Sequence, residues 1–119
     1  MRVMVFVKAN NATEKGLSNT PAEKKMMADM EKFNDELRNA GVMVMAEGLR
    51  PSKDGKRVLF DGPNRKVSEG PFTPAEELVA GFWIWEVKDM NDAVAWVKRC
   101  PNPHPGGGSI AIEIREIGD

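Results

Sequence analysis

Three glutamates of this 119-residue chain could carry acid/base chemistry: Glu47, Glu69 and Glu86. A carboxylate can exchange a proton with a reacting group beside it, and burial raises its pKa toward neutrality. Each glutamate also has a simpler structural interpretation. Glu69 opens a Gly-Pro turn and can accept backbone N–H bonds there, whereas Glu47 and Glu86 can join Glu113 and Arg115 in an ion-pair network. Both interpretations stay open at each position.

The other reactive side chains give weaker signals. His104 is the only histidine, so no metal site is expected. We interpret it as a loop residue, with reach into a partner's cleft as the alternative. Cys100 has no cysteine partner and is expected to be a small buried hydrophobe rather than a nucleophile. The glycines at 106–108 lack the lysine and following helix of a phosphate loop, and no cofactor is expected.

Composition argues against several classes of protein. The 17 basic and 18 acidic residues give a net charge of −1, so no large field favours nucleic acid or an anionic membrane. No apolar run approaches the roughly 20 residues that span a bilayer, and the N-terminal segment lacks the features of a signal peptide. The single cysteine fits a reducing compartment. We therefore expect one domain over residues 1–119, in the cytoplasm, with neither nucleic acid nor a membrane as partner.

Alternation and capping signals divide the chain into elements that must position these side chains. Four strands and a basic hairpin are expected, at residues 2–8, 42–47, 81–87 and 109–117, and at 56–61 with 65–68. Thr20 caps a helix that Gly41 ends, and Asp89 caps a second helix that ends before Pro101. Residues 10–16 are expected to form a polar loop. The second helix should bury one face, made of Met90, Ala93, Val94 and Val97.

This order of elements, β-α-β, a hairpin, then β-α-β, predicts an α+β fold. Its four strands form an antiparallel sheet with both helices on one face. Alternation assigns the β-branched residues to the helix side: Val3, Val5, Val7, Val42, Val44, Ile110, Ile112 and Ile114. The open face then carries Met4, Phe6, Lys8, Met43, Met45, Glu47, Glu113 and Arg115. The sequence does not fix whether Trp83 and Trp85, or their neighbours, join this face.

The turn at residues 69–72 resembles the DGPF-domain group of the YCII-related family. The family's Asp-Gly-Pro-Phe stands here as Glu69-Gly70-Pro71-Phe72, with glutamate for the usual aspartate. The likeness continues, in the family's order, over residues 46–52, 76–85, 96–103 and 112–115. It implies a ferredoxin-like unit that pairs as a dimeric α/β barrel, in a family mostly without an assigned reaction. The histidine–aspartate pair thought to act in shorter relatives does not carry over, because residues 20–40 hold no histidine.

An uncovered apolar sheet face usually marks an interface or a ligand site. We therefore expect a homodimer with a small-molecule cleft between the two sheets, lined by Phe6, Glu47, Phe72, Trp83 and Glu86. Acid/base isomerisation or a lyase-type step is the chemistry that these residue types suggest. The alternative is a non-catalytic dimerisation or regulatory module. In either case the ring of Phe72 is expected to be buried against the strand of Trp83 and Trp85 or against its neighbours.

Overall fold

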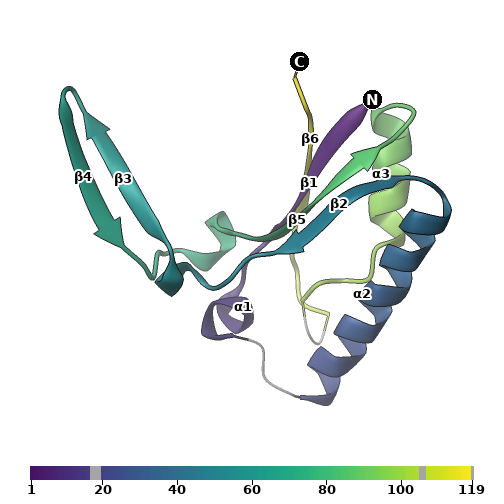
Figure 1. Ribbon diagram of the computed structural model, residues 1–119. Coiled ribbons are helices and arrows are strands. Elements are labelled where there is room, and N and C mark those ends of the chain that lie inside the picture. The colour runs from purple at the N-terminus through teal and green to yellow at the C-terminus, as the bar shows by residue number, and fades with distance from the viewer. Residues whose placement is uncertain (17–19, 105–106, 119) are drawn as a thin grey trace.

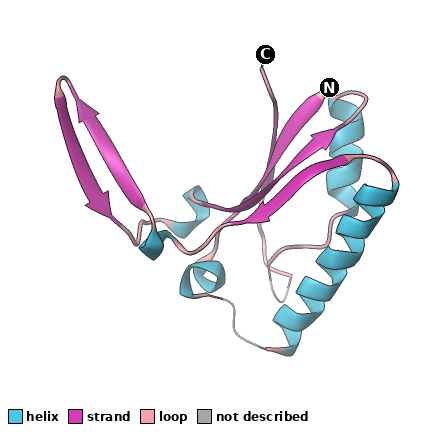
Figure 2. Cartoon of the chain, in the orientation of Figure 1, coloured by secondary structure: helices cyan, strands magenta, loops and turns pink. Residues whose placement is uncertain are grey.

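Four strands form one antiparallel sheet in the order β2-β5-β1-β6. We describe it from a computed structural model, for residues 1–16, 20–104 and 107–118. The strands are β1 (Arg2–Lys8), β2 (Met43–Gly48), β5 (Val79–Glu86) and β6 (Ile112–Glu116). Helices α2 (Pro21–Asn39) and α3 (Met90–Arg99) cover one face, and the other is left open (Figure 1, Figure 2). The predicted ferredoxin-like α+β fold is confirmed.

The core lies between the sheet and these two helices. Its fully or almost fully buried members include Val3, Val5, Phe33, Leu37, Trp83, Trp85 and Ala93. The ring of Phe33 stands edge-on to Trp83 and Trp85, with centroid distances of 6.0 and 6.3 Å, a favourable aromatic geometry. Both tryptophans therefore point toward the helices. By alternation, Phe82, Ile84 and Glu86 face the open side, which settles the orientation that the sequence left undecided.

A bulge in β2 changes two of the predicted faces. The pairing passes from Met43 opposite Trp85 to Met45 opposite Ile84, so Val44 is the extra residue between them. Met43 packs against the core and Val44 is exposed. The predicted assignment of Val44 to the helix side and Met43 to the open face is wrong. Simple alternation fails here because the inserted residue shifts the register of β2 against β5 between Met43 and Met45.

The predicted loop at residues 10–16 contains a short helix, α1 (Asn11–Lys15). The side chain of Asn10 accepts the Thr13 N–H at 3.0 Å, and the Thr13 hydroxyl accepts the Asn10 N–H at 2.9 Å. The same residue types that favour loops also favour helix caps, and here the cap prevails. The C-terminal strand, β6, spans Ile112–Glu116 and is shorter than the predicted strand at residues 109–117.

The two long helices begin where their caps predict. Thr20 accepts the N–H of Glu23 at 3.2 Å, and Asp89 accepts that of Asp92 at 2.8 Å. The predicted face of α3 is partly wrong. Ala93 and Val97 contact the core as expected, but Met90 and Val94 are exposed, and Trp96 and Cys100 pack there instead.

The predicted hairpin forms a separate two-stranded sheet of β3 (Lys56–Asp61) and β4 (Asn64–Glu69), here called the arm. It stands away from the body on the side of the sheet opposite α2 and α3 (Figure 1). Two short 3-10 turns, η1 (Ser52–Asp54) and η2 (Ala75–Glu77), flank its base. The radius of gyration is 15.9 Å. A compact chain of this length would have about 13.5 Å, so the arm extends the molecule.

Candidate functional site

A pocket of about 300 Å³ lies between α2 and the end of the sheet where β2 finishes. Met26 and Met30 of α2 form one wall, and Trp83 of β5 lies on the other side. The rim includes Glu47 and Phe82, which belong to the open face of the sheet. A mostly apolar hollow with a few polar groups is the usual form of a small-molecule site, and this volume lies at the small end of the usual range.

Small residues of two neighbouring strands create the floor of this pocket. Gly48 of β2 pairs with Gly81 of β5, and Ala46 lies one pleat away, so little side-chain volume fills this part of the helix side. At Gly81 an added Cβ would lie 3.1 Å from the Glu47 carbonyl oxygen, so a side chain there would require the backbone of β2 to move by a few tenths of an ångström. At Gly48 an added Cβ would meet nothing within 4 Å. The hollow is therefore a consequence of the residues chosen at the end of the sheet.

One fixed polar pair lies among the apolar walls. The indole Nε1–H of Trp83 donates to the Asn34 side-chain oxygen at 2.8 Å. This bond determines which way the amide points, because the oxygen must face the indole. Asn34 lines the pocket, and with its oxygen held by the indole, its amide nitrogen is the group of this side chain that could donate to a ligand. Glu47 also lines the pocket, but its side chain belongs to the open face of the sheet, so Asn34 is the oriented polar group on the helix side.

Two of the predicted site residues, Glu47 and Trp83, line the pocket, and the other positions lie elsewhere. Phe6 faces the open side, opposite Phe82. Glu86 lies at the far end of β5, four residues beyond Phe82, the partner of Glu47. The two glutamates are thus roughly 13 Å apart along the sheet, at the usual rise per residue. They do not form one acid/base pair.

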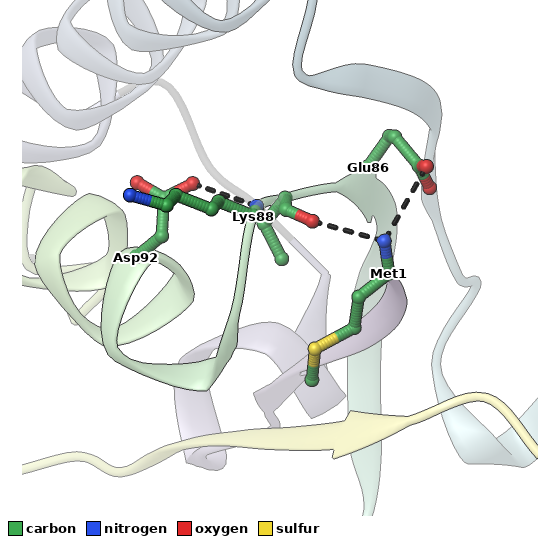
Figure 3. A network of polar contacts seen from close by, with 5 residues as sticks. Met1, Glu86, Lys88 and Asp92 are labelled. Carbon is green, nitrogen blue, oxygen red and sulfur yellow. Dashed lines mark hydrogen bonds and ion pairs between the residues drawn. The ribbon is translucent and has the colours of Figure 1, made fainter.

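Glu86 has a partner at the chain terminus (Figure 3). The amino group of Met1 lies 3.4 Å from the Glu86 carboxylate and donates to the Val87 carbonyl at 3.0 Å. Next to it, the Lys88 N–H donates to the Asp92 carboxylate at 3.0 Å (Figure 3). The Glu86 carboxylate is half exposed, so this is a surface ion pair of small energetic weight.

The predicted corner at residues 69–72 forms the base of the arm. The Arg57 guanidinium lies over the Phe72 ring, 4.0 Å from its centroid, and this ring is not part of the tryptophan core. The expected packing of Phe72 on the tryptophan strand is therefore wrong. Glu69 binds the Lys56 ammonium at 2.7 Å and is largely exposed. The Phe72 N–H donates to the Ser52 hydroxyl at 2.9 Å, so serine takes the capping role expected of Glu69.

Glu14 and Ser52 were missed by sequence reasoning and hold this corner to the body. The Glu14 carboxylate accepts the Ser52 N–H at 2.9 Å and also the Ser52 hydroxyl. A Cβ on Gly70 would lie only 1.7 Å from the Ser52 carbonyl oxygen, so the two segments meet closely. The sequence signal for this contact was the Gly-Pro turn at residues 70–71. Glu14 gave no signal, because it lies in a segment that was predicted to be a loop.

Cys100 and His104 lie outside the pocket. Burial raises the pKa of the Cys100 thiol to about 12, and its sulfur contacts Met30 and the Pro101 carbonyl. The thiol is therefore protonated at neutral pH, as expected for a buried hydrophobe. His104 lines a larger and more polar hollow of about 710 Å³, together with Lys8 and Glu76. In the described part of the chain, no group of three histidine, cysteine or acidic side chains is placed to hold a metal ion.

Comparison with known proteins gives the family. None of the helices described here is long and apolar enough to cross a membrane. A search of curated proteins finds no match. The model of the YCII-related domain family matches residues 1–117, nearly the whole chain. The protein therefore belongs to the YCII-related domain family.

Proposed function

We propose that this protein is a homodimer that binds a small, largely apolar molecule in the pocket between α2 and the β2–β5 end of the sheet. The observation that carries the proposal is the Trp83–Asn34 hydrogen bond, which fixes a donor inside a hollow whose floor is glycine. A ligand with an apolar body and a carbonyl or carboxylate oxygen matches these walls and this donor. The bond also preorganises the donor before the ligand arrives.

Glu47 is the carboxylate that we assign to acid/base work, if the ligand is a substrate. It is among the residues that line the pocket, and its side chain faces the open side, so it could accept a proton from the part of a ligand that extends past the end of β2 to that face. Proton transfer of this kind would support an isomerase or lyase step. Glu69 and Glu86 remain candidates only for structural ion pairs, since each already has a cation and neither lines this pocket.

The dimer part of the proposal comes from the open face of the sheet. Met4, Phe6, Met45, Phe82 and Ile84 form its apolar middle, and Lys8, Glu47, Glu113 and Arg115 bring both signs of charge to its margin. A two-fold interface must be complementary to itself, and a face with an apolar centre and mixed charges meets that condition. Because Glu47 and Phe82 belong to both the face and the pocket rim, a partner on this face would lie at the mouth of the pocket.

A thermal-shift screen against a metabolite library tests ligand binding, since a ligand that binds only the native state raises its melting temperature. The informative variant is Gly48→Val, because Gly48 lines the pocket and a Cβ added there meets nothing within 4 Å. We expect hits on the wild type that disappear in Gly48→Val. Gly118→Val is the matched control, as Gly118 is equally unobstructed and lies outside the pocket. Hits that survive in Gly48→Val would place the ligand elsewhere.

The second candidate function is a non-catalytic dimerisation module. The extent of the apolar open face favours it, because this face could serve assembly alone. It predicts a stable dimer with no ligand response across the library. A dimer whose melting temperature responds to carbonyl compounds, and loses the response in Gly48→Val, would exclude it.

A further inference from the structure

The arm carries an apolar face that this chain does not cover. Val58, Phe60 and Val67 lie on one face of β3–β4, because Val58 pairs with Val67 and side chains alternate along a strand. Their exposed fractions are 51%, 68% and 64%. The Arg65 guanidinium lies over the Phe60 ring at 4.2 Å and still leaves the ring mostly exposed. Three large apolar side chains side by side on a slender hairpin are a common sign of a contact surface.

The arm also lacks the support that a hairpin needs. An isolated two-stranded sheet is marginally stable in water, and stability comes with a third strand or with packing on another surface. Every residue of β3 and β4 is exposed, so the body of the same chain does not supply that packing. A surface that covers the apolar face of the arm would remove both deficits at once.

Charge and position point to a second copy of this chain as the partner. The arm holds four basic and two acidic residues, net +2, which leaves 13 basic and 16 acidic residues, net −3, on the rest of the chain. The arm of one copy and the body of another are therefore attracted to each other. The arm stands on the open side of the sheet (Figure 1), so a copy that covers this face lies beside it.

We propose that the arm, residues 56–69, packs its Val58/Phe60/Val67 face on the partner subunit of the homodimer. The inference rests on the dimer of the proposed function and adds a second contact to it. By two-fold symmetry the contact is made twice, so each arm grips the body of the other subunit. The open sheet faces then form the centre of the interface and the two arms its outer part.

Sedimentation equilibrium of the full chain tests the arm with a matched pair of variants. Phe60→Ser with Val67→Ser removes two of the three apolar side chains of this face, and Leu59→Ser changes a similarly exposed residue on the opposite face of β3. We expect the double variant to raise the dimer dissociation constant by tenfold or more, on the order of one aromatic anchor at an interface. Leu59→Ser should change it less than about twofold, since a residue at the solvated rim contributes little. Near-ultraviolet circular dichroism of the buried tryptophans checks that the body is folded in each variant.

The variant Met45→Glu separates failure of this inference from failure of the dimer. Met45 is an exposed residue of the open face and not of the arm. If Met45→Glu dissociates the dimer and the arm variant does not, the dimer stands and the arm proposal is overturned. If the wild type sediments as a monomer at every concentration, both are overturned. Ligand binding in the pocket is read separately, from the loss of thermal shift in Gly48→Val.

Discussion

Gly70 is a glycine because of what lies beside it, and not because of its backbone conformation. An added Cβ would lie 1.7 Å from the Ser52 carbonyl oxygen. We expect Gly70→Ala to lower the free energy of unfolding by about 1–3 kcal/mol, the usual cost of forcing an extra group into a packed site. Urea denaturation measures it, with Gly118→Ala as the control at a position where a Cβ meets nothing. Equal stability of the two variants would show that the arm base is loosely held.

Burial should make the thiol of Cys100 slow to react in the folded protein. Its pKa of about 12 in the folded protein, against 9.0 for an unperturbed thiol, leaves very little thiolate at pH 8. Alkylation by iodoacetamide should therefore be at least a hundredfold slower, on the order of the lost thiolate fraction, than in the urea-unfolded chain. The loss of free thiol, followed with a chromogenic thiol reagent, gives the alkylation rate of the native protein and of the unfolded chain. Fast alkylation of the native protein would mean that the site opens readily.

The same raised pKa has a definite sign for stability. Between the unfolded and folded pKa values the native state holds the proton and the unfolded state does not. The contribution of Cys100 is complete below about pH 9 and falls as the pH rises from about 9 to about 12. Cys100→Ala should remove this part of the alkaline loss of stability. Urea titrations of both proteins over that range measure the difference.

Local sequence signals predicted where the long helices begin, but they did not predict how the strands pair. The Thr20 and Asp89 caps are written in consecutive residues, so both long helices begin where expected. The bulge at Val44 depends on how β2 pairs with β5, which no local pattern records. The pocket also depends on contacts between residues that are far apart in the sequence. Gly48 and Gly81, like Asn34 and Trp83, come together only after folding, although the small residues at the strand ends were a usable sign.

The residues of the candidate site and of the base of the arm divide in the same way. Glu47 and Trp83 could be chosen from sequence because their residue types suit a ligand site. Asn34 and Glu14 could not, since a helical asparagine and a loop glutamate have many ordinary roles until their partners are known. The turn at Phe72 was predicted correctly, but the sequence does not show which way the arm leaves the body. The side chain over the Phe72 ring is therefore Arg57 and not a tryptophan.

Hydrogen exchange should distinguish the arm from the body. In the variant Met45→Glu, which we expect to be monomeric, the amides of β3 and β4 should exchange far faster than those of β1 and β5. The physical reason is that the arm has a single hairpin ladder and no buried side chain, whereas β1 and β5 are inner strands over the core. Mass spectrometry of peptic fragments reads both regions in one experiment. Equal protection of the two regions would contradict the description of the arm as an unsupported hairpin.

At the scale of the whole molecule, we expect a particle of about twice the 13.2 kDa chain mass. Light scattering at micromolar concentration should give this mass for the wild type and that of a monomer for Met45→Glu, which puts a charge in the proposed interface. Val94→Glu is the control, because Val94 is similarly exposed on α3, on the other side of the sheet. A wild type that scatters as a monomer would contradict the dimer.

The pocket beside Trp83 is the proposed ligand site, and the indole N–H of Trp83 reports directly on its occupancy. The chain has three tryptophans, so a proton–nitrogen correlation spectrum shows three indole signals, and the signal that moves in Asn34→Leu is that of Trp83. Titration with small carbonyl and carboxylate compounds should shift the Trp83 signal in the wild type and leave it unmoved in Gly48→Val. Binding that shifts the other two indoles but not Trp83, or that persists in Gly48→Val, would show that the ligand does not bind in this pocket.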